Sequence, residues 1–471
     1  MQNTLMAYTV IFQRQLLTIG IGLSVLACPV AAQVPSNQIQ VPSNQIFAPP
    51  VLSTPNTANP AIATPSVAQP TLTTPIAPVS GSPETAAPTD APIPVIVSKP
   101  RKKSRPISVA RQHPVIKDDP RPSFTPDTFI ATAEAASRYL DIVERGGWPT
   151  ISGSLTYGAK GQQVANLRKR LAAEGDLAEA EGVIFDNTVQ DAVKQFQYRH
   201  GLIKNGVVSG LTLKELNVSA SIRFQQLNET ARRMAARNFD FGQRYVIANI
   251  ASASIEAVEG DSVVRRYVAV VGKPDLPSPE VTARIGIVNF NPTWTVPTSI
   301  IKNEIIPKMQ KNPNYLNTLN IRILDRSGEE INPRSIDWKS QKAVNYTLRQ
   351  DSSKSNALGQ IRIDMPNKHS VYMHDTPSKR FFSADFRFLS HGCVRVEGVR
   401  DLANWLLEPN GGWNRQRIDS AIDEGERKDV RLAQPVNVAW VYMTGFVTKD
   451  GLVNFREDVY GLDSAEKLAA N

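Results

Sequence analysis

Hydrophobic residues recur at helical spacing in the second quarter of the chain. A first helical segment begins near Asp127 and ends at two glycines followed by a proline, a combination that stops helices. Further helix faces are indicated by apolar residues three or four positions apart: Val164, Leu167, Leu171, Val189, Val193 and Phe196. Periodicity alone fits a packed three-helix bundle without a ligand at 151–217. The flanking segments 127–150 and 218–243 are predicted to form a helical scaffold.

From Tyr245 onward the spacing changes to that of β-strands. The predicted strands are 245–250, 254–258 and 262–271. Gly260 and Asp261 place a tight turn between the second and the third of them. The pattern predicts a β-rich domain built of hairpins over residues 244–433, with 434–471 as a C-terminal extension.

Helical spacing returns inside this domain. It runs from Pro297 to Met309, and polar sequence then continues to about Gln350. A long inserted segment above a site is frequently a lid, so about 298–350 is predicted to be a helical capping insertion. The predicted fold class is therefore multidomain α+β: a small helical bundle beside a mostly β domain with a helical insertion.

The first 126 residues have a different composition. A basic residue precedes the apolar run 16–27, and small residues follow at 30–32, so residues 1–32 are predicted to be a signal peptide. The run is short for a transmembrane helix, which needs about 20 apolar residues. Residues 33–126 hold 20 of the 34 prolines and are predicted to be a disordered spacer. We therefore expect export to the periplasm or cell envelope, with lipid anchoring through Cys28 as the minor alternative.

Charge and cysteine content exclude some classes of protein. The 471 residues carry a formal charge of +9, which suits anionic partners, but no nucleic-acid-binding motif is present. The two cysteines, Cys28 and Cys393, are too few for a disulfide framework or a four-thiolate zinc site. If the leader is removed, Cys393 is the sole thiol of the mature chain.

The strongest chemical signal is a cluster around that thiol. Three of the five histidines fall in one short stretch with the cysteine: His369, His374, His391 and Cys393. A thiol becomes a useful nucleophile when a neighbouring imidazole takes its proton. Gly392 lets a substrate carbonyl approach, so that backbone N–H groups near Cys393 can stabilise an oxyanion. Arg395 can clamp a carboxylate.

Other interpretations of the same residues stay open at this point. A free cysteine is most often a small buried hydrophobe, and the histidines could be packing residues. A zinc site formed by His374, His391 and Cys393 is weakly supported, because no further ligand stands at a recognised spacing. No metal and no cofactor is therefore predicted.

The sequence resembles the L,D-transpeptidase (YkuD-type) family. The family motif is a histidine, a loop and then Ser/Thr-His-Gly-Cys, which His374 and the run Ser390-His391-Gly392-Cys393 match position by position. The YcbB-like branch is similar through Gly146-Gly147-Trp148-Pro149, Asn291-Pro292-Thr293-Trp294 and Asn356-Ala357-Leu358-Gly359. Residues 155–217 resemble the peptidoglycan-binding helical module.

The resemblance implies an enzyme acting on the tetrapeptide stems of peptidoglycan. Cys393 would attack the carbonyl of the third stem residue and expel the terminal D-alanine, leaving a thioester. An amine of a neighbouring stem would then resolve it, giving a cross-link between third-position residues. His374 would be the general base and then the general acid. The resemblance also assigns supporting residues: Ser390, His391 and Gly392 to the oxyanion site, Tyr372 and Arg395 to substrate binding.

The implied partners are the stem peptides and glycan of peptidoglycan, with other cell-wall synthesis enzymes as further candidates and no nucleic acid. Related functions use the same residues. Water or a free D-amino acid could be the acceptor, which would make the protein an L,D-carboxypeptidase or an exchange enzyme. A sortase is a more distant rival, because its cysteine motif differs. A non-catalytic wall-binding protein is the alternative from another class.

Overall fold

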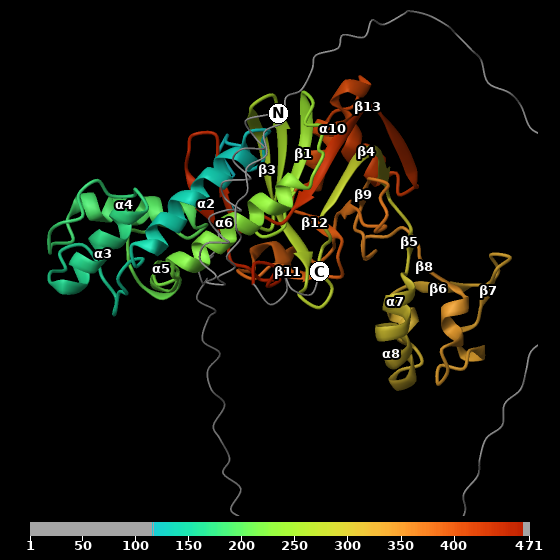
Figure 1. Cartoon of the computed structure of the whole chain (residues 1–471). Coiled ribbons are helices and arrows are strands. Elements are labelled where there is room, and N and C mark those ends of the chain that lie inside the picture. The colour runs from blue at the N-terminus through green and yellow to red at the C-terminus, as the bar shows by residue number, and fades with distance from the viewer. Residues whose placement is uncertain (1–114, 116, 465–471) are drawn as a thin grey trace, which may run out of the picture. The chain divides into compact units, whose positions relative to one another are not determined.

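The computed structural model describes residue 115 and residues 117–464. The predicted signal peptide, Cys28 and most of the proline-rich segment lie outside the described residues. The described part contains a helical region, a large mixed β-sheet and a smaller α/β insertion (Figure 1). None of its helices combines the length and the apolar character that crossing a bilayer demands.

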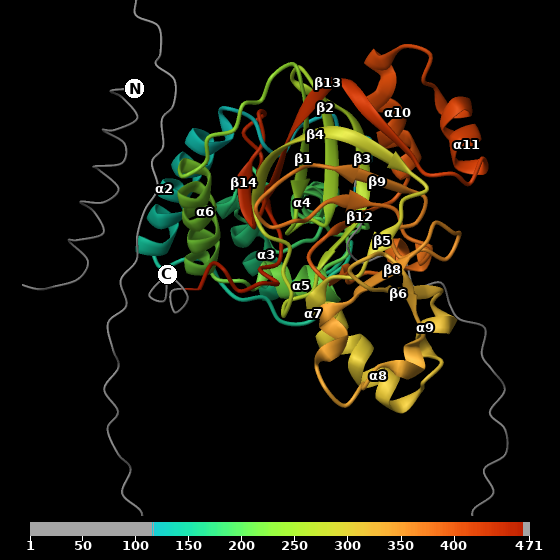
Figure 2. The same cartoon turned by 90° about the vertical axis from the view of Figure 1, so that its right-hand side faces the viewer.

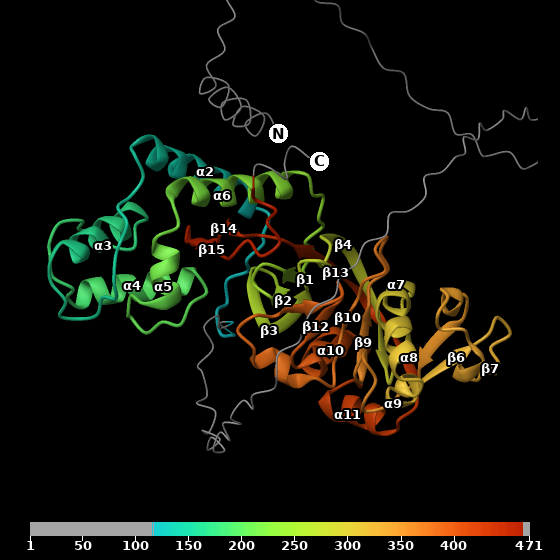
Figure 3. The same cartoon turned by 90° about the horizontal axis from the view of Figure 1, so that it is seen from below.

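The helical region begins with the predicted scaffold and bundle. Its helices are α2 (Thr128–Glu144), α3 (Gln162–Ala173), α4 (Asn187–Arg199), α5 (Gly210–Leu216) and α6 (Ala220–Ala235). The apolar faces predicted for α3 and α4 are confirmed, because Val164, Leu167 and Phe196 are fully buried in one cluster. Helices α2 and α6 lie side by side (Figures 1 and 3) and share a second cluster that includes Tyr139 and Leu227.

Nine strands form the main sheet, in the order β11-β3-β12-β10-β9-β4-β13-β1-β2. These are β1 (Arg244–Asn249), β2 (Ser254–Glu259), β3 (Ser262–Gly272), β4 (Val281–Phe290), β9 (Ile361–Asp364), β10 (Met373–His374), β11 (Phe388–Ser390), β12 (Val394–Val396) and β13 (Lys428–Val441). Strand β3 pairs with β2 along its first part and with β12 near its end, so the sheet closes on itself.

The prediction of a domain built of hairpins is wrong for most of this sheet. Only β1, β2 and β3, and then β9 and β10, follow one another as antiparallel neighbours in this sheet. The pairs β1–β13, β10–β12 and β3–β11 are parallel. Parallel partners need long connections between them. The insertion and the helices lie within the connections of β1 to β13, and residues 375–393, with a 3₁₀ turn and β11, connect β10 to β12. Spacing within each strand could not reveal that arrangement.

Two helices cover one end of the sheet (Figure 2): α10 (Val399–Leu407) and α11 (Arg415–Asp423). Leu402 and Ile418 from these helices enter the main hydrophobic core with Trp440 of the sheet. The predicted domain boundary at residue 433 is wrong, because β13 continues to Val441 and pairs with β1 and β4. The hairpin β14 (Gly445–Val447) and β15 (Val453–Phe455) then packs against α2 and α6.

The insertion is a small folded unit with its own core. Its helices are α7 (Thr298–Ile300), a π-helical turn (Ile301–Ile305), α8 (Ile306–Lys311) and α9 (Tyr315–Thr318). Its four-stranded sheet has the order β5-β8-β6-β7, from β5 (Trp294–Thr295), β6 (Ile321–Leu324), β7 (Glu330–Ile331) and β8 (Thr347–Gln350). The prediction of a purely helical insertion is therefore incomplete. The strands are short and separated by polar residues, which hides their alternation.

Short 3₁₀ turns complete the described chain. They are Pro333–Ser335, Lys342–Asn345, Lys379–Ser383 and Glu408–Asn410.

The end of the predicted disordered spacer is folded. The Val263 amide donates to the Pro120 carbonyl (2.8 Å), and the Ser123 amide donates to the Glu256 carboxylate (2.9 Å). Phe124 is 5% exposed and packs against the ring of Phe241, with 5.0 Å between centroids. The disorder prediction is therefore wrong for residues 117–126, because one aromatic side chain and a few polar ones supply the burial that the composition did not suggest.

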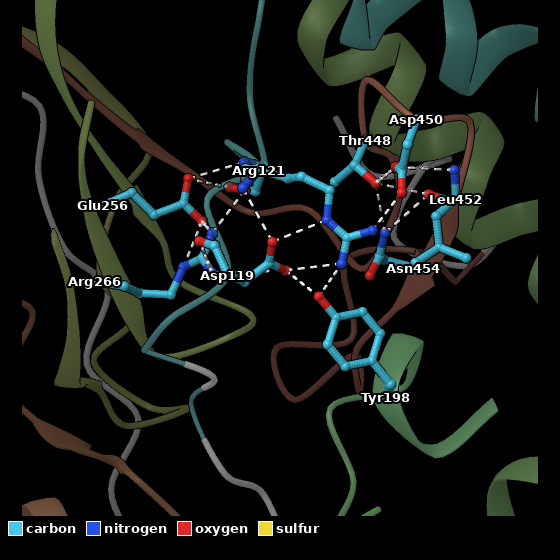
Figure 4. Close-up of polar contacts among 10 residues, drawn as sticks. Asp119, Arg121, Tyr198, Glu256, Arg266, Thr448, Asp450, Leu452 and Asn454 are labelled. Atoms are coloured by element: carbon cyan, nitrogen blue, oxygen red, sulfur yellow. Dashed lines mark hydrogen bonds and ion pairs between the residues drawn. The ribbon is translucent and has the colours of Figure 1, made fainter. Parts of the chain in front are cut away.

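A polar network joins this segment to the other parts of the fold (Figure 4). Arg121 bonds Asp119, Asp450 beyond β14 and the hydroxyl of Tyr198 on α4. On the sheet side, Arg266 of β3 pairs with Glu256 of β2 at 2.9 Å. The N-terminal segment thus connects the helical bundle to the sheet.

We expect Phe124→Ala to lower the free energy of unfolding by about 3–5 kcal/mol, because it empties a buried aromatic site. Ile130→Ala, which truncates a side chain 50% exposed on the neighbouring helix, should change it by less than about 0.5 kcal/mol. Urea unfolding followed by tryptophan fluorescence measures both. Equal midpoints for Phe124→Ala and the wild type would mean that residues 117–126 do not pack on the domain.

Candidate active site

The predicted site residues gather on one face of two adjacent strands. Strands β10 and β12 are parallel, with Met373 opposite Val394 and His374 opposite Arg395. Side chains alternate along a strand, so the first pair and the second pair point to opposite faces. Met373 and Val394 lie fully buried in the main core. His374 and Arg395 therefore occupy the other face.

Tyr372 and Cys393 precede these strands in matching positions. The Val394 amide donates to the Tyr372 carbonyl (3.2 Å), which continues the ladder by one step. The alternation places both residues on the same face as His374. The rings of Tyr372 and His374 meet edge to face, with 5.7 Å between centroids. The structure thus places Tyr372, His374 and Cys393 on the same face of two neighbouring strands.

The loop before Cys393 is held by local hydrogen bonds. The Ser390 hydroxyl donates to the Cys393 carbonyl (2.5 Å) and accepts from the Gly392 amide (3.2 Å). The Gly392 carbonyl accepts from the Ser278 hydroxyl (2.7 Å), a contact that the sequence did not suggest. Gly392 has φ +109°, a conformation that residues with a Cβ rarely adopt. Because its amide is bonded to Ser390, Gly392 shapes the loop and does not offer a free oxyanion donor here.

The side chain of His391 contacts the insertion. Its ring is exposed, and Nε2 contacts the carboxylate of Glu304 on the π-helical turn. The predicted contribution of His391 to the oxyanion site has no support in this geometry. Glu304 was missed by sequence reasoning because it lies 87 positions before His391, in no recognisable motif.

His374 is a buried imidazole held in one tautomer. It is 5% exposed, and its Nδ1 donates to the Asp375 carbonyl (2.5 Å), which leaves the lone pair on Nε2. Burial lowers the pKa of His374 to about 3, and the charge of Arg395 acts in the same direction. The carbonyl groups of Asp375 and Leu358 oppose this shift of the pKa. The imidazole is therefore neutral at physiological pH and able to accept a proton.

Asp375, which the sequence analysis missed, holds that imidazole in place. Its buried carboxylate accepts from the Gln360 amide (3.1 Å) and pairs with Lys379. Gly359 allows the Asp375 side chain to lie close to the backbone. It has φ +63°, and a Cβ at this position would lie 2.5 Å from the Asp375 side chain. In the sequence, the glycine of the run Asn356 to Gly359 could have indicated a close contact at this point. Its partner, Asp375, lies 16 positions further along the chain.

Cys393 is a partly exposed free thiol. Burial raises its pKa above the ordinary value. The Tyr372 amide and hydroxyl and the cations Arg395 and Arg362 act in the opposite direction without reversing the shift of the pKa. Thiol and imidazole are thus both neutral before reaction. Among the described residues, no group of three or more His, Cys, Asp or Glu side chains is placed to hold a metal ion.

Arg362 is a further site residue that the sequence analysis did not identify. It lies on β9 directly opposite His374, and its guanidinium carbon is 5.0 Å from the centre of the Tyr372 ring. In the sequence, the only indication of its role is a charged residue between two apolar ones, Ile361 and Ile363, which are both fully buried in the structure. Arg362, which also pairs with Asp364 at 3.0 Å, and Arg395 bring two guanidinium groups to this face, which suits a substrate that carries carboxylates.

Two family models match the chain. Residues 243–437 match the family described as "L,D-transpeptidase catalytic domain", and residues 160–216 match the family described as "Putative peptidoglycan binding domain". The resemblance found in the sequence is therefore confirmed at the level of the two domains. The fold class, a helical module followed by a mostly β domain, is confirmed as well.

Three proteins similar to this chain are named as L,D-transpeptidases. A Haemophilus influenzae protein named "Putative L,D-transpeptidase" is 31% identical over 260 residues, which are 55% of this chain and 51% of that protein. The chain thus spans about half the length of this curated relative. Among solved structures, an L,D-transpeptidase from Xylanimonas cellulosilytica aligns at 16% identity and TM-score 0.21, over 62% of this chain and 99% of its own. An L,D-transpeptidase from Stackebrandtia nassauensis aligns at 12% identity and TM-score 0.24, over 62% of this chain and 96% of its own.

Arg362→Gln should raise the pKa of the Cys393 thiol, because it removes a positive charge beside it. The pH profile for alkylation of Cys393 by iodoacetamide, followed by peptide mass mapping, should move up by about one pH unit or less. Arg284→Gln, the same change on an exposed part of β4, should leave the profile unchanged. A profile that does not move in Arg362→Gln would exclude this electrostatic contribution.

The depressed pKa of His374 also predicts a pH dependence of stability. Below pH 6.5 the unfolded chain protonates this histidine, whereas the folded chain does so only near about 3. Stability should therefore fall as the pH drops through that interval, by up to about 1.36 kcal/mol per pH unit from this group. His374→Gln should show a shallower loss in urea unfolding curves between pH 7 and pH 4. Parallel curves for the two proteins would contradict the assignment.

Proposed function

We propose that this protein is a cysteine-dependent L,D-transpeptidase acting on peptidoglycan, because residues 243–437 match the L,D-transpeptidase catalytic-domain family. The observation that carries the proposal is the pairing of β10 with β12, which gathers Tyr372, His374 and Cys393 on one face. The family match to a peptidoglycan-binding domain at 160–216 supports the same polymer as substrate.

The first half-reaction acylates the thiol. Cys393 Sγ attacks the carbonyl of the third residue of a tetrapeptide stem, while His374 Nε2 takes the thiol proton. When the tetrahedral intermediate collapses, His374 returns that proton to the nitrogen of the leaving D-alanine. The products are a thioester on Cys393 and free D-alanine.

In the second half-reaction an amine of a neighbouring stem attacks the thioester. His374 accepts a proton from that amine and gives it to the departing sulfur, which restores the thiol. The new amide joins the third residues of two stems. Water or a free D-amino acid in place of the amine would give hydrolysis or exchange with the same residues.

The neutral state of the Cys393 thiol and the His374 imidazole determines when the proton is transferred between them. A thiol with a raised pKa and an imidazole with a pKa of about 3 do not exchange a proton before substrate arrives. The proton therefore moves as the new carbon–sulfur bond forms. Burial keeps the Tyr372 hydroxyl protonated by raising its pKa. This hydroxyl is suited to donate to the developing oxyanion in place of Gly392.

The location and partners follow from the substrate. We propose an exported enzyme of the periplasm or cell envelope, with a lipid anchor at Cys28 as the alternative. The helical module would hold the enzyme on the polymer, and other cell-wall synthesis enzymes are candidate partners. Two positive side chains beside the thiol, Arg362 and Arg395, support recognition of stem carboxylates.

Cys393→Ala should abolish the acyl-enzyme that mass spectrometry detects after incubation with a disaccharide-tetrapeptide. His374→Gln should slow acylation by about 10²–10⁴-fold, the usual contribution of a general base. His369→Gln is the matched control, because this exposed histidine lies five positions earlier, and it should acylate at the wild-type rate. An adduct on Cys393→Ala would overturn the assignment of the nucleophile.

Product analysis after incubation with purified tetrapeptide muropeptides distinguishes the related functions. Cross-linked dimers are expected for the transpeptidase. Tripeptides alone would make the protein a carboxypeptidase, and exchanged tetrapeptides would make it an exchange enzyme. Unchanged muropeptides together with a thiol inert to alkylation would favour a non-catalytic wall-binding protein.

A further inference from the structure

A cavity of about 200 Å³ lies where the helical module meets the sheet. Its walls come from the end of α4, from α5, from the turn between β1 and β2, and from residues 385–388 and 456–459. None of the site residues described above lines it. Residues 385–388 run directly into β11, which ends at Ser390 in the loop of the nucleophile. The cavity therefore adjoins both domains that the proposed function requires.

One wall residue, His200, has a buried nitrogen without a protein partner. The side chain is stacked on the Phe196 ring, with 3.8 Å between centroids, and is 3% exposed. Its Nδ1 lies 2.7 Å from the Phe196 carbonyl, which can only accept, so Nδ1 carries the proton. Nε2 is then an acceptor, and no hydrogen-bond partner meets it among the described residues. Burial keeps the ring neutral by lowering its pKa far below the ordinary value.

The rest of the lining combines two phenylalanines with charged residues of both signs: Glu215, Asp385, Arg387, Arg456 and Glu457. Phe386 is 50% exposed, unusual for so large an apolar side chain, and its ring centre lies 5.4 Å from that of Phe388. Glu215 and Glu457 add carboxylate oxygens, which remain able to accept hydrogen bonds although they pair with Arg223 and Lys214.

These groups suit a neutral ligand rich in hydrogen-bond donors. A buried neutral imidazole and carboxylate oxygens accept from hydroxyl or amide N–H groups, and an exposed phenyl ring covers an apolar face. An acidic peptide fits less well. Arg456, which also lines the cavity, already donates to the carbonyl groups of Arg199 and Phe455, and the three lining carboxylates would repel an acidic peptide. The volume is below the roughly 300–1,000 Å³ of pockets for drug-sized molecules, so one ring fills it.

We propose that this cavity binds one N-acetylated sugar ring of the glycan strand of peptidoglycan. The proposal rests on the proposed function, because that glycan carries the stem peptides. Binding here fixes the glycan against both the helical module and the segment that leads to Cys393. A stem attached to the bound strand then has a restricted reach, which raises its effective concentration at the thiol.

The test is the affinity of the full chain for an N-acetylglucosamine tetramer without peptide, measured by isothermal titration calorimetry. The wild type should bind it, and Phe386→Ala should weaken binding by about tenfold. His200→Phe keeps an aromatic ring between its neighbours and removes the Nε2 acceptor together with the Nδ1 donor to the Phe196 carbonyl, so it should weaken binding as well. Tyr157→Ala is the control, because it removes an aromatic side chain 58% exposed on the same module, outside the cavity.

A wild type that does not bind the tetramer at millimolar concentration would overturn the proposal. Wild-type affinity in Phe386→Ala would do so too, as would loss of binding in Tyr157→Ala alone. Thermal unfolding of each variant checks the fold. If His200→Phe does not fold, the affinity of Phe386→Ala alone tests the proposal. Because the tetramer carries no peptide, this result is independent of acylation. A protein that is acylated by a stem but ignores the tetramer would refute the cavity and leave the proposed function standing.

Discussion

The pairing of β10 with β12 is the constraint on which the candidate site depends. Each strand contributes only a few residues, yet their register decides which side chains meet. A slip by one residue would send His374 into the core and bring Met373 to the site, since side chains alternate. The neighbours β9 and β3 prevent this, because each pairs with one of the two strands along its other edge. The chemistry is thus fixed by backbone hydrogen bonds before any side-chain contact is made.

Charged residues at the base of the helical module are equally constrained. Arg170 and Arg199 are almost completely buried and share the carboxylate of Glu174, while Arg199 also binds Asp176 at 2.5 Å. Removing one member of such a group leaves an uncompensated buried charge, which commonly costs about 3–5 kcal/mol. The contacts are directional, so they fix the orientation of α3 against α4. Together with the network around Arg121 (Figure 4), they define how the module meets the sheet.

The helices of the module and the grouping of the catalytic candidates could be predicted from the sequence, because the residues that mark them lie close together along the chain. The helix faces of α3 and α4 follow from spacing, and the grouping of His374 with Cys393 follows from a motif. The strand order could not be predicted, because parallel neighbours come from distant segments. Glu304 and Asp375 carry no pattern that marks their partners, since each acts through a contact that only the folded chain creates. Residues 117–126 were misjudged because composition averages over a segment, whereas Phe124 and a few polar contacts anchor it.

The contact between His391 and Glu304 joins the insertion to the loop of the nucleophile. Both side chains are about one-third exposed, and ion pairs of this kind contribute about 0–1 kcal/mol. An energy of that size changes a population ratio by no more than about fivefold. The insertion is therefore weakly tethered at this point, and thermal motion alone can separate it from the loop. A contact of that strength breaks and re-forms without any input of chemical energy.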